Sequence, residues 1–412
     1  MEAVANTMAD VRVALRRDAR HRTATALILV LPLALFLLLT FLVPIGALLW
    51  RAVDNPEIAR AVPRTVAALA RWDAASPPPD AAYAAFVADL QALREQTDAG
   101  MLARRLNTEV GGARSLVMNA WRAQPLPAAV NDAAVRAQLI ALDPRWEEPW
   151  IWQAIAKNGA RLTPDYLLAS VDLKRATDGS VVTMEADRSA FRRILARTFG
   201  IAALVTAIAL VLAYPLAWWL STMAPRRANV LLIVVLVPFW TSILVRVAAW
   251  IVLLQSGGLV NQALRGIGLI DQPLALLFNR TGVVIALVHI LLPFMVLPLY
   301  SVMKSIPRDY VRAAVSLGSH PLAAFLRVYV PQTYAGVAAG SLLVFILAIG
   351  YYVTPALLGG PEDQMLSYSV AQYANVHVDW GMACALGSVL LAATLVLYAI
   401  YRRLARMEPA LA

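Results

Sequence analysis

The sequence DYVRAAVSLGSHPLAAFLRVYVPQT, residues 309–333, lies between two long apolar runs and yet does not have the pattern of a membrane span. Asp309 suits the first turn of a helix, and Gly318 suits a left-handed helix end. We expect a second helix to follow at once, capped by Ser319 and with Pro321 in its first turn. Its apolar side chains recur at helical spacing and form one stripe: Leu322, Phe325, Leu326, Tyr329 and Val330. Such a stripe predicts that another surface covers it.

The composition is that of a membrane protein. Of 412 residues, 60% are hydrophobic and only 15% are charged, against about 25% charged residues in ordinary soluble domains. A helix needs about 20 apolar residues to cross the hydrocarbon core. Six runs meet this length and predict six transmembrane helices near residues 24–50, 198–220, 229–254, 282–303, 334–357 and 381–401.

The first run has two interpretations. Arginines precede it and small residues end it, as in a signal peptide. However, residues 23–50 carry no charge, and this length exceeds the apolar part of a signal peptide, which is about 7 to 15 residues. We therefore expect a retained membrane anchor.

Lys and Arg are distributed unevenly among the short loops, and this predicts the orientation. They are frequent in the N-terminal segment, around Arg226, in the quoted loop and in the tail, whereas the opposite short loops hold only Arg265 and Arg280. Both termini and the quoted loop are therefore expected in the cytoplasm. The net charge of +10 is explained by this bias, and no nucleic-acid partner is expected. The single cysteine, Cys384, excludes an internal disulfide.

Residues 51–193 have balanced charge and several helix-period segments, and they predict a folded domain on the outer side. Helical patterns cover RTVAALARW, DAAYAAFVADLQALREQ, ARSLVMNAWRAQPLP and DPRWEEPWIWQAIAKNG, the last of which ends at Gly159. The domain shows no pattern of metal ligands and no nucleophile motif. A docking or scaffolding role is favoured over an enzymatic one.

Two polar residues fall inside predicted spans. Arg246 lies in the third, where a charged side chain costs about 2.5 to 3.5 kcal/mol. Its side chain either lines a water-filled pathway between helices, or reaches outward to the membrane interface, or forms a structural pair with another residue. His289 in the fourth span either faces a pathway or makes an interhelical hydrogen bond. Trp240, Tyr351 and Tyr352 offer ring faces for a cationic substrate, and they are equally compatible with packing or with the interface belt.

The quoted loop is expected to protrude into the cytoplasm with an apolar face, which requires a partner. The chain contains no G-x-x-x-x-G-K-[ST] phosphate loop. If ATP powers transport, another subunit must hydrolyse it.

This segment resembles the EAA loop of ABC importer permeases, in which E-A-A is followed by three residues, glycine, nine residues and I-x-L-P. Arg312, Ala313 and Ala314 occupy the EAA positions, Gly318 the glycine, and Val328, Val330 and Pro331 the closing positions. Arg312 reverses the charge of the family's glutamate, so a contact through an acidic group does not carry over.

The stretches YPLAWWL, PFWTSILVRVAAWIVLL, LLPFMVLPLYSVMKSIP and GSLLVFILAIGYYVTPALLGGPEDQML narrow the resemblance to the spermidine/putrescine-type permeases, which are type I importers with a methionine-permease-like transmembrane domain. The implied fold is an all-α bundle of six transmembrane helices with a mostly helical extracytoplasmic domain between helices 1 and 2. The resulting division is 1–23 cytoplasmic segment, 24–50 helix 1, 51–193 inserted domain, 194–406 permease domain with coupling loop 304–333, and 407–412 tail.

The resemblance implies a bacterial inner-membrane permease that works with two ATP-binding cassette ATPase subunits, a second related permease subunit and an extracytoplasmic solute-binding protein. The coupling loop, including Leu322 and Phe325, would seat on an ATPase. This chain would bind no cofactor or metal and would not be an enzyme, because ATP and Mg would be used by the partner.

The expected cargo is spermidine, putrescine or a related polyamine. The transmembrane runs contain no Asp or Glu, however, so a phosphonate or an opine-like amino acid stays open as an alternative. The same absence of carboxylates argues against an ion-coupled secondary transporter. A receptor or scaffold would explain residues 51–193 but not the coupling loop.

Overall fold

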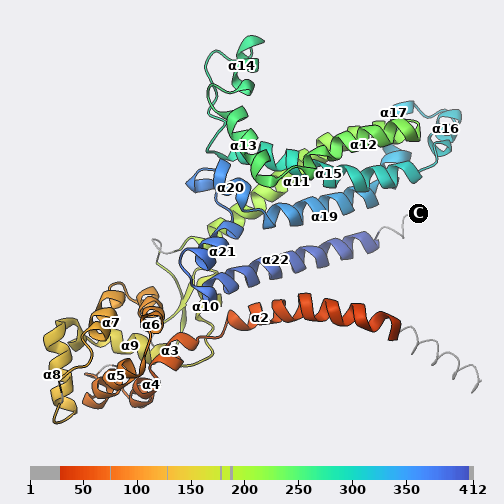
Figure 1. Cartoon of the computed structure of the whole chain (residues 1–412). Coiled ribbons are helices and arrows are strands. Elements are labelled where there is room, and N and C mark those ends of the chain that lie inside the picture. Colours follow the sequence, from red (N-terminus) through yellow and green to blue (C-terminus); the bar gives the residue numbers. More distant parts are fainter. Residues whose placement is uncertain (1–27, 75, 128, 177–178, 186–188, 408–412) are drawn as a thin grey trace, which may run out of the picture. The chain divides into compact units, whose positions relative to one another are not determined.

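The computed structural model describes residues 28–407 apart from residues 75, 128, 177–178 and 186–188 (Figure 1). It divides into two units, Met1–Arg51 and Ala52–Ala412. The predicted cytoplasmic segment 1–23 and residues 408–412 of the predicted tail fall outside the described residues.

The described part of the first unit is one apolar helix. It runs over Ile28–Arg51, 24 residues with a mean hydropathy of 2.8, which is long enough to cross a bilayer. A π-helix, η1 (Leu38–Leu42), precedes α2 (Val43–Arg51). The hydroxyl of Thr40 donates to the carbonyl of Phe36 at 2.7 Å, so this polar group is satisfied within the helix itself.

The second unit begins with the inserted domain, which is mostly helical as predicted. Proline opens α3, α4 and α9, where its missing N–H costs nothing and its fixed φ suits the first turn. The elements are α3 (Pro56–Ala61), α4 (Pro63–Leu69), α5 (Asp80–Ala92), α6 (Gln96–Glu109), α7 (Ala113–Arg122), α8 (Asp132–Leu142), η2 (Pro144–Glu147), α9 (Pro149–Lys157), α10 (Asp165–Ala169) and the antiparallel pair β1 (Leu173–Arg175) and β2 (Val181–Thr183).

Aromatic side chains form the centre of the inserted domain's core. The Tyr83 and Trp152 rings lie 4.4 Å apart and the Phe86 and Trp146 rings 4.8 Å apart, and all four residues are fully buried. The Tyr83 hydroxyl and the Trp152 indole N–H each donate to the carbonyl of Trp146 at 3.0 Å. The polar atoms of two buried rings are thereby satisfied.

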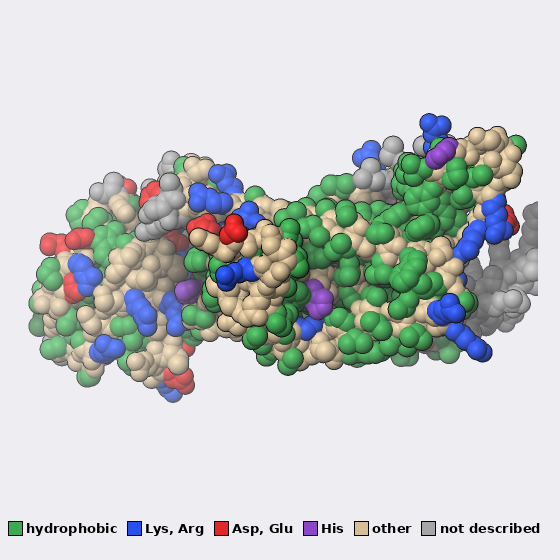
Figure 2. All heavy atoms as spheres, turned by 90° about the horizontal axis from the view of Figure 1, so that it is seen from above, with side chains coloured by type: hydrophobic (Ala, Val, Ile, Leu, Met, Phe, Trp, Pro, Cys, Tyr) green, Lys and Arg blue, Asp and Glu red, His purple; other side chains and the backbone are tan. Residues whose placement is uncertain are grey.

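The membrane part follows. Its elements are α11 (Phe191–Thr222), α12 (Pro225–Trp240), α13 (Ile243–Leu254), α14 (Leu259–Gly266), α15 (Arg280–Ser305), α16 (Asp309–Ser316), α17 (Pro321–Ala324), η3 (Phe325–Tyr329), α18 (Val330–Gln332), α19 (Tyr334–Gly350), α20 (Val353–Leu358), η4 (Pro361–Asp363), α21 (Leu366–Asn375) and α22 (Trp380–Met407). Hydrophobic side chains cover most of its visible surface, whereas charged side chains gather on the inserted domain and at the opposite end of this unit (Figure 2).

Helix α15 is the centre of the bundle and packs against both α11 and α19. Small residues allow this close approach. On α11 the buried face carries Ala202, Ala209 and Ala213. On α19, a Cβ at Gly340 would lie only 2.8 Å from the Met295 sulfur of α15. Small side chains at helix interfaces let backbones approach and gain van der Waals contact in lipid, where there is no hydrophobic drive between helices.

Two predicted spans differ from the structure. The run 229–254 is not one helix, because α12 ends at Trp240 and α13 begins at Ile243. Pro238 explains this break, because proline lacks the N–H group that would make a helical hydrogen bond near the end of α12. The run 334–357 is also broken, between α19 and α20. Five helices of the described chain are long and apolar enough to cross a membrane, or up to six if a bent pair, 321–332 with 334–350, counts as one span.

The inserted domain contacts the membrane part at several places, two of which lie at the starts of α11 and α22. Asp172, which is buried, accepts hydrogen bonds from the backbone N–H groups of Ala190, Phe191 and Arg192 at 2.8 to 3.0 Å and thereby caps the start of α11. Beside it, Tyr166 of α10 packs so closely on Gly381 that a Cβ there would lie 2.5 Å from the ring. Both contacts link the domain directly to membrane-spanning helices.

Candidate functional site

The coupling loop has the helix, break and helix order predicted from the sequence. Helix α16 ends at Ser316, with Leu317 as its C-cap, and the next residue, Gly318, has φ +92°. The N–H of Gly318 donates to the carbonyl of Val315 at 2.9 Å, and the N–H of Ser319 donates to the carbonyl of Ala314 at 3.1 Å. This pair of bonds is a Schellman motif, which requires a left-handed residue at the glycine position.

The second helix begins one residue later than predicted. His320, not Ser319, is its N-cap, and His320 Nδ1 accepts from the N–H of Leu322 at 3.3 Å. Helix α17 then passes into the π-helix η3 and the short α18.

The apolar stripe of this segment is divided between two surfaces. Tyr329 is buried in the bundle, and the Phe325 ring stacks on it at 5.4 Å and meets Trp218 of α11 edge-on at 5.5 Å. Leu322 and Leu326 point away, with 61% and 54% of their surface exposed. The rings therefore fix the segment to its own bundle, while the leucines remain uncovered.

The remaining residues of the EAA pattern lie on or near this surface. Arg312 is exposed and forms an ion pair of 3.6 Å with Asp309 one turn earlier, an arrangement of small stabilising effect in water. Ala313 and Pro331 are exposed, whereas Ala314, Val328 and Val330 are half-buried.

The coupling loop is also bonded to the end of α11. The Arg308 guanidinium donates to the carbonyl of Thr222 at 2.6 Å, and the Lys304 ammonium donates to that of Met223 at 3.2 Å. At the other end of the loop, the hydroxyls of Tyr214 and Thr333 lie 3.1 Å apart. The loop is thus bonded to α11 or to its C-cap at both of the loop's ends.

Three of the five predicted pathway residues lie together. The indole N–H of Trp250 donates to His289 Nδ1 at 3.2 Å, and their rings meet edge-on at 5.3 Å. The charge of Arg246, one helical turn before Trp250, acts on both the His289 and the Tyr351 side chains. Arg246 Nε is buried and has no hydrogen-bond partner among the described residues.

Trp240 and Tyr352, the other two predicted pathway residues, are exposed, and among the described residues no hydrogen bond or ring contact joins them to this cluster. Trp250 was missed by the sequence reasoning. The signal that could have found it is its i, i+4 spacing from Arg246, which places both on one helix face.

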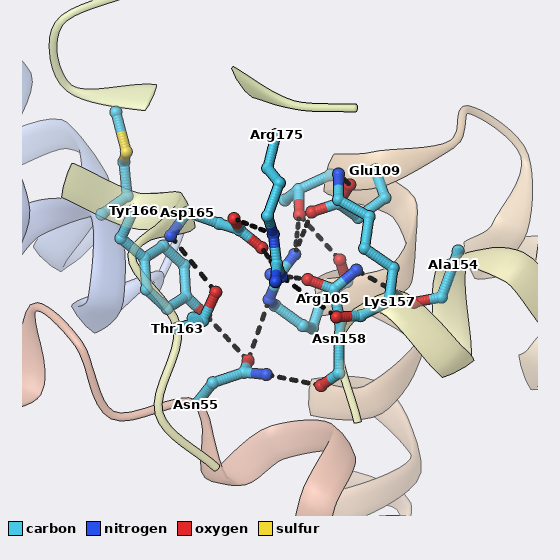
Figure 3. A network of polar contacts seen from close by, with 12 residues as sticks. Asn55, Arg105, Glu109, Ala154, Lys157, Asn158, Thr163, Asp165, Tyr166 and Arg175 are labelled. Carbon is cyan, nitrogen blue, oxygen red and sulfur yellow. Dashed lines mark hydrogen bonds and ion pairs between the residues drawn. The ribbon is translucent and has the colours of Figure 1, made fainter. Parts of the chain in front are cut away.

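A cavity of about 470 Å³ lies where the inserted domain meets α21 and α22. Its polar wall is a network centred on Arg105 (Figure 3). The Arg105 guanidinium donates to Asn55 Oδ1 at 3.1 Å, to Asn158 Oδ1 at 2.7 Å and to Glu109 Oε1 at 3.1 Å. It also lies over the Tyr166 ring, 5.0 Å from the centroid.

The charges of this network are matched within it. Glu109 also accepts from Lys157 at 2.9 Å, and Arg175 forms two bonds to Asp165 at 3.0 and 3.1 Å. Burial alone raises the pKa of Glu109, but the Arg105 charge and the Lys157 hydrogen bond outweigh it and lower that pKa overall. The network holds α3, α6, α9 and α10 together. Its charged side chains are paired with one another, which indicates a structural rather than a catalytic role.

Among the described residues, no group of three or more His, Cys, Asp and Glu side chains is placed to hold a metal ion.

Comparison with known proteins identifies the membrane part. The spermidine/putrescine transport system permease protein PotB of Escherichia coli (strain K12) is 34% identical over 215 residues, which cover 52% of this chain and 78% of that protein. PotB of Haemophilus influenzae (strain ATCC 51907 / DSM 11121 / KW20 / Rd) is 32% identical over 214 residues, 52% of this chain and 74% of the relative.

Among solved structures, a chain of a bacterial alginate ABC transporter in complex with an alginate pentasaccharide-bound periplasmic protein is similar, with a TM-score of 0.44 and 17% identity over 53% of this chain and 78% of that one. Residues 188–407 match the family described as the binding-protein-dependent transport system inner membrane component. The chain therefore belongs to this family and is a multi-pass ABC importer permease of the inner membrane.

Proposed function

We propose that this permease passes a polyamine, such as spermidine or putrescine, inward by ATP-driven alternating access. The support for the cargo is the identity of its membrane part to the PotB permeases. We propose further that both termini and the coupling loop face the cytoplasm and that the inserted domain faces outward.

The coupling loop is proposed to seat on an ATP-binding cassette ATPase. The observation that carries this proposal is the division of its apolar side chains, with the rings anchored in the bundle and Leu317, Leu322 and Leu326 exposed. Covering these three leucines would contribute on the order of 4 kcal/mol, taking about 1.5 to 3 kcal/mol per fully buried side chain and partial burial here. That contribution favours docking before ordering costs are subtracted.

The proposed assembly has two ATPases, a second related permease and an extracytoplasmic solute-binding protein. ATP and Mg would be bound by the ATPases. When ATP draws the ATPases together, the seated loops move with them, and the bonds from Arg308 and Lys304 to the end of α11 pass that movement into the bundle.

The test of coupling is Gly318→Val. The position has φ +92°, and a β-branched residue is strained there by about 1 to 2 kcal/mol. We expect uptake to fall at least tenfold and less ATPase to copurify, while the permease still assembles in the membrane. Gly266→Val, at a glycine with open space around it, is the control. Normal uptake by Gly318→Val would refute the proposal.

Arg246 favours a second candidate cargo. A half-buried arginine whose Nε is buried and has no partner among the described residues suits an anion better than a polyamine, so a phosphonate is the alternative. The purified complex with its cognate binding protein distinguishes them by ligand-stimulated ATP hydrolysis. Stimulation by spermidine that persists in Arg246→Gln supports the polyamine. Stimulation by a phosphonate that is lost in Arg246→Gln supports the alternative.

A further inference from the structure

Helices α6 and α7 of the inserted domain enclose an open pocket of about 510 Å³ that is separate from the membrane bundle. Each helix contributes one polar face, at helical spacing. The residues that line the pocket include Gln96, Arg104 and Asn107 of α6 and Arg114, Ser115, Asn119 and Arg122 of α7.

The pocket has an unbalanced charge. Three arginines line it, and no Asp or Glu does. Arg114 and Arg122 are exposed, and no ion pair joins either to a described residue. The neighbouring Asp143 does not neutralise them, because its carboxylate is held by Arg145 at 2.7 Å, and this bond lowers the pKa of Asp143.

Other hydrogen-bond donors in the pocket are also unused. Asn107 Oδ1 accepts from the N–H groups of Gly112 and Arg114 at 3.1 and 3.2 Å. The amide nitrogen of Asn107 therefore points away from these two N–H groups. The side-chain amides of Gln96 and Asn119 make no hydrogen bond to a described residue. The lining is therefore rich in donors and poor in acceptors.

We propose that this pocket binds a phosphate ester of a polar alcohol. Arg114 and Arg122 are eight residues apart, about 12 Å at 1.5 Å per residue, so their long side chains reach a ligand between them from two directions, and Arg104 approaches from α6. A tetrahedral phosphate offers oxygens to three guanidinium groups at once, whereas a planar carboxylate offers two. The pocket is larger than a phosphate, and its amides suit the hydroxyls of an attached alcohol.

The phosphate can come from a lipid headgroup or from a soluble ester. Arg104 donates to the carbonyl of His377 at 2.8 Å, in the loop that leads into the membrane-spanning helix α22. The side chains of Val376, Val378 and Trp380 around this carbonyl are exposed and apolar. The pocket thus opens beside a segment suited to the bilayer interface, which brings headgroup phosphates within reach.

The test uses the full-length protein and the pair Arg114→Ala/Arg122→Ala. Both side chains are exposed, so folding is not at stake. The matched control is Arg60→Ala/Arg71→Ala, two exposed arginines of the same domain that do not line the pocket. One arm counts phosphatidylglycerol retained in nanodiscs of phosphatidylglycerol and phosphatidylcholine by native mass spectrometry. The other measures calorimetric binding of glycerol 3-phosphate in nanodiscs of phosphatidylcholine alone.

We expect the double variant to bind at least about tenfold more weakly than the control in one arm, since it loses two charge-assisted hydrogen-bond donors to the ligand. Loss of retained phosphatidylglycerol identifies the lipid as the source, and loss of glycerol 3-phosphate binding identifies a soluble ester. Equal behaviour of the double variant and its control in both arms overturns the proposal. Neither arm depends on which solute the bundle transports.

Discussion

The inserted domain and the membrane part are both helical, yet among the described residues only the inserted domain fully buries aromatic side chains. The four largest fully buried side chains in the described chain, Trp146, Trp152, Tyr83 and Phe86, all belong to the inserted domain. The bundle instead brings helices together through Ala202, Ala209 and Gly340. In water the removal of large apolar surface stabilises a core. In lipid that drive is absent, and close backbone contact replaces it.

Of the substitutions that test this difference, Trp152→Ala is expected to have the largest effect. Removing a fully buried aromatic side chain costs about 3 to 5 kcal/mol. We expect the inserted domain to unfold at lower temperature and to be cleaved faster by protease, while the membrane bundle resists both. Trp150→Ala, at a half-buried ring on the same helix, should change little. Equal sensitivity of the two variants would contradict an aromatic core.

The corresponding test in the bundle adds atoms. In Gly340→Val the new side chain meets the Met295 sulfur, since even a Cβ would lie 2.8 Å from it. Overpacking of this kind costs about 1 to 3 kcal/mol, and we expect a lower thermal stability of the bundle in detergent. Gly200→Val on α11, where nothing lies within 4 Å, is the control. A bundle that tolerates both would show that α15 and α19 are not held by close contact.

The link between the two regions is tested by Asp172→Ala. The change leaves three N–H groups at the start of α11 without their acceptor, a loss of about 1 to 2 kcal/mol by analogy with helix caps. We expect faster hydrogen exchange at residues 190–192. Asp172 has φ +59°, in the left-handed region. Asp172→Asn keeps an acceptor and tolerates this backbone conformation, and should exchange at an intermediate rate. Unchanged exchange in Asp172→Ala would mean that the cap does not hold the helix start.

Acid should lower the stability of the inserted domain more than that of the bundle. This difference is the smallest of the effects predicted here. The pKa of Glu109 is lowered in the folded state. Its contribution is therefore complete above the ordinary pKa of a glutamate and is lost as the pH falls through the lower folded value. The melting temperature of the inserted domain should drop between neutral pH and about pH 3, and Glu109→Gln should reduce that drop. A variant that follows the wild-type profile would assign the acid sensitivity elsewhere.

Local signals in the sequence were sufficient for much of the fold. Gly318 was predicted as a left-handed helix end, and its φ of +92° confirms this. The helical patterns at DAAYAAFVADLQALREQ and DPRWEEPWIWQAIAKNG contain α5 and α9. These features depend on neighbours within a few residues, where propensity and spacing carry the information.

Features that depend on distant residues were not predictable in this way. The bonds of Arg105 reach Asn55 and Asn158, each at least 50 positions away. The cap of α11 by Asp172 spans a loop, and the short hairpin β1–β2 has only three residues in each strand. The break between Trp240 and Ile243 had only Pro238 as a local sign. Tertiary contacts decide such positions, and a single sequence does not reveal them.

The π-helix at Phe325–Tyr329 sets the direction in which the exposed leucines of the coupling loop face relative to the rings that anchor it. A π-turn contains one residue more than an α-turn. Deleting any one of these five residues would restore a regular α-helix and would rotate the residues before it by about 100° relative to those after it. Leu322 and the anchoring rings would then no longer face opposite ways. A one-residue deletion here would thus rotate the exposed leucines relative to the bundle, and the surface of the partner that binds the loop would have to change with it.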